Sequence, residues 1–382
     1  MDYRLTDEQS LIAETVREFA ETRVRPFVRE WDEAQSFPAE LFAEMGELGL
    51  MGVMIPEEYG GVGLGPLELS TVMEELGRVD PSVALAVAAH NGLCVGHIAV
   101  GANEEQKQRY FPKLATGEWV GCWGLTEPQA GSDAAGTQTR AEWNEERNGW
   151  ILNGAKTFNT NGARAHVAVV LAVTTPGLGT KGISAFIVEA GTPGYRVGRK
   201  EDKLGMRASD TVELILEDCF VPAENLLGER DLGFVDALKV LDRGRISIGA
   251  LSVGIAQGAL EAALEYAQER HQFGRPIASF EAIRAKLARM AAGTRTARDM
   301  VYRAARLRAD DKPFKLEASM GKLFASEVGM FVAEEAVQIF GGYGYVKDYP
   351  VEKFFRDAKL CTIGEGTSEV QRLVISRQLL AS

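Results

Sequence analysis

The sequence predicts an α+β protein of three domains: a helical N-terminal domain, a central antiparallel β domain and a C-terminal four-helix bundle. Three observations support this prediction. Apolar residues recur at helical spacing from Thr6 to about Glu118, short β-rich runs follow Trp119, and long helical patterns return at Leu232. We place the domains at residues 1–118, 119–230 and 231–382, and we find no internal repeat.

The first domain shows helical spacing at Ile12, Val16 and Phe19, and two later helix starts are marked by local caps. Asp80 precedes a proline at the first helical position, and residues 103–106 form a capping-box pattern. Residues 60–66 are rich in glycine, but they lack the GxGxxG spacing and the preceding strand of a dinucleotide site. We therefore interpret them as a structural loop.

The second domain is predicted as a small antiparallel sheet or barrel. Asn-Gly pairs at 148–149, 153–154 and 161–162 mark hairpins or turns. Residues 177–182 match GxGxxG, but a strand follows them instead of a helix whose N-terminus could hold a pyrophosphate, so we expect a hairpin loop. The predicted strands cover residues 137–143, 149–152, 166–173, 182–188 and 211–216.

The third domain contains long helical patterns separated by short connections. They cover residues 243–270, 280–308 and 314–340, and a final helix follows Gly366. Glycines at 249, 254 and 258 predict that the first of these helices packs closely against its neighbours. Four helices with short connections are typical of a bundle.

Composition excludes several classes of function. The chain has 382 residues, 46% of them hydrophobic, so it can bury a large core, and its net charge of −12 argues against nucleic acid or an anionic membrane as main partner. We find no apolar run that reaches the roughly 18 residues of a membrane span. Thr6 begins a capped helix rather than a targeting signal, and four separated cysteines predict reduced thiols. We expect a cytoplasmic protein.

Glu365 is the first candidate catalytic residue, because it lies between Gly364 and Gly366, just after a charged helical segment. Glycine on both sides gives the backbone access to conformations closed to other residues and lets a ligand approach the main chain. We interpret Glu365 as a candidate general base. The alternative is a solvated acid at a helix N-terminus that Thr367 caps.

Further motifs occur in a fixed order along the chain. Residues 123–133 run from a strand into a loop rich in hydroxyls and small residues, which can present backbone donors to a planar ligand. This motif is followed by residues 156–162, 270–274, 338–344 and 365–368. With these motifs, essentially the whole chain resembles the acyl-CoA dehydrogenase family. The resemblance implies an acyl-CoA dehydrogenase-like fold, with FAD held between the β domain and the bundle.

The resemblance also implies a role for individual residues. The segment 338–342 resembles one that the neighbouring subunit contributes, so one flavin site would need two chains. The implied FAD contacts are Trp123, Leu125, Thr126, Ser132, Phe158, Asn159, Thr160, Arg270, Gln272, Phe273, Phe280, Gln338, Ile339, Gly341, Gly342, Thr367 and Glu369. The implied substrate contacts are Ser132, Asp242, Arg245, Gly364 and Gly366.

Three positions bear on the chemistry that the resemblance implies. Some members carry the base immediately before the arginine that matches Arg245, but this chain has Gly244 there, so the base is expected to be Glu365. Phe158 stands where relatives usually have tryptophan, which keeps stacking but removes the indole donor. Gly364 replaces a tyrosine, and we hypothesise extra room for a branched, cyclic or otherwise bulky acyl group.

The implied reaction is oxidation of a saturated acyl-CoA to the trans-2-enoyl-CoA. Glu365 would abstract the α-proton, a hydride would pass from Cβ to FAD, and an electron-transfer flavoprotein would accept the electrons. A homotetramer is expected by resemblance. Open alternatives are an oxidase, a dehydrogenase for carrier-protein-bound acyl groups, and a non-catalytic flavin or CoA-thioester binding scaffold.

Two other clusters are weaker candidates. His90, Cys94 and His97 could share a helix face as metal ligands, but a fourth ligand is not evident and we expect no metal. Three tyrosines at 343, 345 and 349 could form a stacking platform for nucleic acid, but no basic groove accompanies them. We favour packing as their role.

Overall fold

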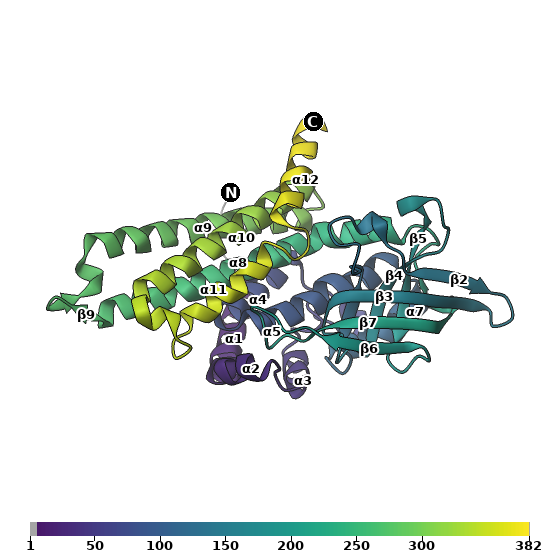
Figure 1. Ribbon diagram of the computed structural model, residues 1–382, viewed down its shortest axis with the longest axis horizontal. Coiled ribbons are helices and arrows are strands. Elements are labelled where there is room, and N and C mark those ends of the chain that lie inside the picture. The colour runs from purple at the N-terminus through teal and green to yellow at the C-terminus, as the bar shows by residue number, and fades with distance from the viewer. Residues whose placement is uncertain (1–5, 382) are drawn as a thin grey trace.

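The structure is a computed structural model that describes residues 6–381. It confirms the predicted fold class, with a helical N-terminal part, a middle β part and a helical C-terminal part. The molecule is elongated, with the long C-terminal helices at one end and the β-sheet at the other (Figure 1). The N-terminal helices lie along one side and contact both.

The predicted caps form at the starts of N-terminal helices. The Thr6 hydroxyl accepts from the Gln9 N–H, Asn103 forms the same box with Gln106, and Asp80 accepts from the N–H of Ser82. The helices are α1 (Asp7–Phe19), α2 (Val28–Ala34), α3 (Glu40–Glu47), α4 (Pro66–Val79), α5 (Pro81–Ala88), α6 (Gly96–Gly101) and α7 (Glu104–Ala115).

Eight strands form the sheet of the middle domain. They are β1 (Gly121–Gly124), β2 (Arg140–Asn144), β3 (Gly149–Thr160), β4 (Val167–Val173), β5 (Ile183–Glu189), β6 (Tyr195–Lys200), β7 (Thr211–Pro222) and β8 (Leu226–Leu227). Their order is β6-β7-β3-β2-β4-β5-β8, and β1 pairs with β4. Most pairs are antiparallel as predicted, but β4 pairs in parallel with β1 and, at Arg140 and Val173, with β2. The strands that lie between them in the chain provide the crossover that a parallel pair needs.

The three Asn-Gly pairs have different roles. Asn148, with φ 46°, closes the β2–β3 hairpin, and Asn161, with φ 66°, ends β3. The prediction of a turn at Asn153 was wrong, because the ladder between β3 and β7 shifts register at Gly154 and continues beyond it, as in a bulge. Residues 177–182 connect β4 to β5, so they form the predicted hairpin loop.

The C-terminal helices are α8 (Gly233–Glu269), α9 (Glu281–Ala309), α10 (Lys315–Phe340), α11 (Val351–Cys361) and α12 (Ser368–Ala381). From the sequence, the final helix α12 was predicted to be the fourth helix of the bundle. Within this chain α11 takes that place, because Val351, Phe354 and Ala358 are buried in the core, whereas α12 projects away from it (Figure 1). A hairpin of β9 (His271–Gln272) and β10 (Arg275–Pro276) connects α8 to α9.

Two helical stretches, Pro81–Gly101 and Gly233–Glu269, are long and apolar enough to cross a membrane by length and composition. The prediction that no run reaches this length was therefore wrong. Their most apolar windows are 72% and 83% buried inside the protein, which is the behaviour of core helices. Many alanines and valines, spread around all faces, give these helices their high mean hydropathy.

Candidate functional site

Glu365 lies in the short link between α11 and α12. Its φ is 52° and that of Gly366 is 94°, so two successive residues adopt the left-handed region. That conformation is unfavourable for glutamate and must be held by its surroundings. The Lys322 ammonium on α10 donates to the Gly366 carbonyl at 2.7 Å, and the Gln371 amide on α12 donates to the carbonyls of Glu365 and Gly366 at 3.3 and 3.1 Å.

The Glu365 carboxylate lies directly against α8 at Gly244. A Cβ atom built on Gly244 would be 2.0 Å from Oε2 of Glu365, so any side chain there would displace the carboxylate. Oε2 itself is buried and has no hydrogen-bond partner among the residues described. An acceptor atom that is desolvated and unpaired in this way is available for a proton of a bound ligand.

Burial raises the pKa of Glu365 to about 7, although the positive charges of Lys322 and Arg245 pull the pKa down. Arg245 is itself buried and donates to Asp242 at 2.5 Å and to the Ser319 hydroxyl at 3.2 Å. The Thr367 hydroxyl does accept from the N–H of Val370, as a cap would. Glu365 as a whole is half-buried, but its buried Oε2 distinguishes it from the solvated acid that the alternative interpretation required.

The loop after β1 is tied to β3 by a buried ion pair. Glu127 accepts from the Lys156 ammonium at 2.6 Å and from the backbone N–H groups of Gln138 and Thr139 at 2.7 and 3.0 Å. Lys156 also donates to the carbonyl of Leu125 at 3.2 Å. These bonds fix the loop that carries Leu125, Thr126 and Ser132 next to the second predicted flavin segment.

Phe158 is the most exposed part of that second segment. Its φ is 59°, it lies in a register shift of β3, and its side chain is 65% exposed. Its neighbour Asn159 is buried and donates to the carbonyl of Val212 at 2.9 Å, so that side chain is already used inside the sheet. Thr160 is half-buried. Ser132, in the loop after β1, is exposed.

These residues fit FAD, which has a planar aromatic ring system. An exposed phenyl ring is costly to leave in water, and Gly131 has open space where no described atom lies within 4 Å of a built Cβ. Flat stacking on Phe158 and hydrogen bonds from the neighbouring hydroxyls would suit such a ring system.

The predicted flavin contact Trp123 is half-buried, and its indole N–H donates to Nδ1 of His97 at 2.9 Å. His90 also accepts a hydrogen bond from β1, because its Nδ1 accepts from the N–H of Gly121 at 3.0 Å. Burial lowers the pKa of both histidines to about 4. Both therefore hold β1 in place as neutral rings, and no group of three metal-ligating residues occurs in the described part of the chain.

A second group of predicted FAD contacts lies far from the first. Arg270, Gln272, Phe273 and Phe280 lie at or beside the β9–β10 hairpin, at the end of the molecule opposite the β domain (Figure 1). Phe273 is 93% exposed and forms an edge contact with Phe280, with ring centroids 5.9 Å apart. The fold of one chain therefore keeps these residues away from Thr126 and Phe158.

The segment 338–342 belongs to this second group. It ends α10, where Gln338, Gly341 and Gly342 are exposed and Ile339 is buried. Arg270 lies over the ring of Tyr343 at 5.3 Å, which places the hairpin and this segment together. Tyr349 packs as expected and makes an edge contact with Tyr343, but the prediction of packing was wrong for Tyr345, which is 88% exposed. Thr367 and exposed Glu369, in contrast, lie beside Glu365 at the start of α12.

Sequence reasoning missed four side chains that support these groups, namely Glu127, Lys156, Lys322 and Gln371. Glu127 and Lys156 lie inside predicted motifs, so their position alone could have suggested a role. Lys322 and Gln371 carry no local signal, because each lies within a helical pattern. Only their burial and their bonds to the turn at Glu365 reveal them.

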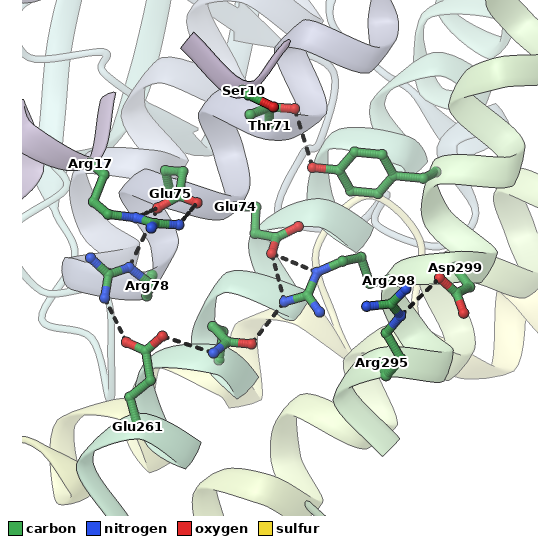
Figure 2. A pocket seen from close by; sticks show the side chains of 12 residues that line it. Ser10, Arg17, Thr71, Glu74, Glu75, Arg78, Glu261, Arg295, Arg298 and Asp299 are labelled. Carbon is green, nitrogen blue, oxygen red and sulfur yellow. Dashed lines mark hydrogen bonds and ion pairs between the residues drawn. The ribbon is translucent and has the colours of Figure 1, made fainter. Parts of the chain in front are cut away.

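A separate polar cavity of about 530 Å³ lies between α1, α4, α8 and α9 and contains none of the predicted site residues. Figure 2 shows that its charged side chains pair with one another: Arg17 with Glu75, Arg298 with Glu74 and Arg78 with Glu261. The first pair joins two N-terminal helices, and the other two link α4 to the bundle helices α9 and α8. Because its charges compensate each other, we assign the cavity a structural role.

Three domain descriptions of one family match the chain. The acyl-CoA dehydrogenase N-terminal domain matches residues 6–118, the middle domain residues 122–219, and the C-terminal domain residues 231–380. Among curated proteins, the short-chain specific acyl-CoA dehydrogenase of Clostridium acetobutylicum is 47% identical over 379 residues, with 99% of this chain and 100% of that protein covered.

Solved structures agree with this comparison. A chain in a structure described as the electron transferring flavoprotein of Acidaminococcus fermentans is 48% identical, with a TM-score of 0.98 and 100% of both chains covered. An acyl-CoA dehydrogenase of Bacillus anthracis complexed with FAD is 38% identical, with a TM-score of 0.93, and covers 99% of this chain and 67% of that one.

Proposed function

This chain belongs to the acyl-CoA dehydrogenase family, and we propose that Glu365 is the base of its reaction. As a member it is an oxidoreductase that uses FAD to dehydrogenate an acyl-CoA thioester. The observation that carries the proposal is the buried Oε2 of Glu365, which has no partner among the described residues and lies against the bare backbone of Gly244.

Glu365 has the properties that abstraction of an α-proton requires. A general base works best when its pKa lies near the working pH, and burial raises the pKa of Glu365 to about 7. As the proton leaves, negative charge develops on the thioester oxygen. The backbone N–H of Glu365 donates to no described protein group, so it is free to stabilise that charge.

Two groups of residues would hold the cofactor. The first is the loop at Thr126 and Ser132 together with Phe158, and the second is the hairpin at Arg270 with the segment 338–342. When bound, FAD supplies the acceptor for the hydrogen that leaves Cβ. Asp242 and Arg245 would position the thioester beside Glu365, and Gly366 would let it approach the main chain.

The variant Glu365→Gln tests the assignment of the base, because it keeps the shape of the side chain and removes its basicity. We expect yellow, folded protein that still binds a CoA thioester and loses at least ~10²-fold in kcat. The measurement is anaerobic bleaching of the flavin by acyl-CoA, with ligand binding followed by the flavin spectrum. Near-normal bleaching by this variant would place the base elsewhere.

The acyl group is a further part of the proposal. The Clostridium relative is short-chain specific, and we propose a short acyl chain here as well. Gly364 adds a second expectation, because the atoms nearest to a Cβ built there are the carbonyl and side chain of Leu360 at 3.5–3.8 Å, so a side chain would meet no closer atom than an ordinary contact. We therefore propose that short branched or cyclic acyl groups are accepted.

A panel of acyl-CoA substrates separates these possibilities. We expect branched or cyclic short acyl-CoA thioesters to be turned over at least as well as straight ones, and Gly364→Tyr to reduce that tolerance. Preference for straight chains throughout would contradict the role of Gly364. Turnover of carrier-protein thioesters alone, or rapid peroxide formation in air, would instead support the two same-fold alternatives. Absence of bleaching by every thioester would support a binding scaffold.

The assembly and the electron acceptor are also proposals. The β9–β10 hairpin, which carries the second group of FAD contacts, lies at the end of the long helices away from the β domain that carries the first group (Figure 1). This separation supports a site completed by a second copy, in a homotetramer. The similarity to a chain in a structure described as an electron transferring flavoprotein supports such a flavoprotein as acceptor. The expected cytoplasmic location stays a prediction.

A further inference from the structure

Lys322 is buried without a carboxylate partner. Its side chain is 0% exposed, and within residues 6–381 it forms no ion pair at 4.0 Å or less. The chain's other deeply buried lysines differ in this respect, because Lys156 pairs with Glu127 at 2.6 Å and Lys353 pairs with Asp357 at 2.6 Å. A buried ammonium without such a partner is costly to the fold.

Among the residues that the structure describes, Lys322 makes one hydrogen bond, and it is directed at the turn that carries Glu365. It donates to the carbonyl of Gly366 at 2.7 Å, and that carbonyl also accepts from Gln371 at 3.1 Å. Gly366 follows Glu365, and both residues have positive φ. Two side chains from two different helices thus converge on one carbonyl of a strained turn, and only one of them carries charge.

The groups around this turn come from four segments. Arg245 on α8, Cys361 on α11, Glu369 on α12 and Glu365 itself all interact electrostatically with Lys322. Glu365 in turn feels Lys322 and Arg245. Burial and Arg245 lower the pKa of Lys322 to about 8, so the ammonium is still charged where Glu365 ionises.

We propose that Lys322 is a positioning residue for proton abstraction, which holds the turn of Glu365 and Gly366 through the Gly366 carbonyl and stabilises the ionised Glu365 by its charge. This inference rests on the proposed role of Glu365 as the base. It assigns two separable effects to Lys322, one of geometry and one of charge. Gln371 supplies geometry alone, since its amide is neutral.

Three variants separate the two effects. Lys322→Met removes the charge and the hydrogen bond, Lys322→Gln keeps a neutral donor, and Gln371→Met removes a neutral donor to the same carbonyl. The readout is the pH dependence of kcat/KM for flavin reduction in FAD-loaded enzyme, which reports the pKa of the base in the free enzyme. KM and kcat are determined separately, because lost positioning lowers kcat more than it raises KM.

Both Lys322 variants are expected to move the acidic limb of the profile upward by about one pH unit or more, because a nearby cation has been removed from a carboxylate. Gln371→Met should lower kcat and leave the midpoint in place. Lys322→Met should combine both effects. An unchanged midpoint in both Lys322 variants would overturn the proposal, as would loss of the fold in both, since Lys322 would then be structural only.

The variant Glu365→Gln distinguishes this inference from the proposed function. If Glu365→Gln is inactive and the Lys322 variants keep the wild-type midpoint, only the role of Lys322 is wrong. If Glu365→Gln remains active, the proposed base is wrong and the inference fails with it. A shifted midpoint together with an inactive Glu365→Gln supports both.

Discussion

At the scale of single residues, Gly244 and Glu365 form one unit. The carboxylate lies where a side chain at position 244 would lie, with Oε2 only 2.0 Å from a built Cβ. The sequence has no acidic side chain at position 244, where some members of the family carry the base. The structure adds a steric reason, because the glycine makes room for the acid that comes from the α11–α12 link.

Gly244→Ala is predicted to displace the Glu365 carboxylate and to lower kcat/KM by about 10²-fold, which is the usual effect of a small misplacement of a catalytic group. Flavin reduction is the measurement, and FAD content should stay unchanged. Gly293→Ala in α9 is the matched control, because a Cβ there meets Val328 at an ordinary 3.4 Å. Equal activity of the two variants would show that Glu365 does not use the space at Gly244.

The proposed role of Glu365 as the base predicts how the reaction depends on pH. The carboxyl must be ionised to accept a proton, and burial raises its pKa from 4.5 to about 7. We therefore predict that kcat/KM reaches its upper level above neutral pH and falls about tenfold per pH unit below it. A steady-state pH profile measures this. A midpoint near 4.5 would mean that bulk water reaches the carboxylate freely.

At the scale of elements, the loop after β1, which carries the predicted flavin contacts Leu125, Thr126 and Ser132, is held in place by its contact with β3. Lys156 on β3 donates to Glu127 and to the Leu125 carbonyl, and the Thr157 N–H donates to the Thr126 carbonyl at 2.9 Å. Burial lowers the pKa of Lys156 to about 8, while Glu127 pulls it upward. The ion pair therefore orders a loop that has little secondary structure of its own.

Lys156→Met is predicted to weaken FAD binding at least about tenfold, equivalent to ~1.4 kcal/mol, because Glu127 would be left buried and unpaired and the loop would rearrange. Fluorescence titration of the apoprotein with FAD measures the Kd. Lys353→Met is the matched control. Lys353 lies on α11 and, like Lys156, is buried and forms an ion pair with a carboxylate. It should reduce the free energy of unfolding without changing the Kd for FAD. An equal change of Kd in both variants would contradict a specific role for Lys156.

At the scale of the whole molecule, the elongated shape separates the two groups of proposed FAD contacts. The β9–β10 hairpin, which follows Arg270 and precedes α9, lies at the end of the long helices away from the β domain whose strand β3 carries Phe158 (Figure 1). Phe273 is 93% exposed, which is expected of an apolar side chain that a second chain would cover in the assembly. The site is therefore proposed to be a property of the assembly.

Subunit complementation tests this proposal. Chains carrying Glu365→Gln and chains carrying Arg270→Glu should each be nearly inactive alone. When the two chains are coexpressed, activity should return at about a quarter of the sites. Random pairing makes about half of the dimers mixed, and each mixed dimer has one intact site out of two. Activity per bound FAD measures this. If each site lay within one chain, mixing would restore nothing.

Much of this protein could be predicted from its sequence. Helix caps at Thr6, Asp80 and Asn103 act within four residues, so local pattern determined them. The spacing of apolar residues predicted the three domains in their order along the chain. The motif around Glu365, together with its order relative to the upstream motifs, identified the candidate base and the family.

Only the tertiary structure decided the features that depend on contacts between distant segments. The proposed role of Lys322 depends on the packing of α10 against the link between α11 and α12, where Lys322 donates to the Gly366 carbonyl. Gly154 continues a strand instead of turning, because β7 provides a partner on both sides of the bulge. The separation of Arg270 from Phe158 follows from the length of α8. Burial and long-range pairing set the energy of each of these features, and neither quantity is encoded in any short stretch of sequence.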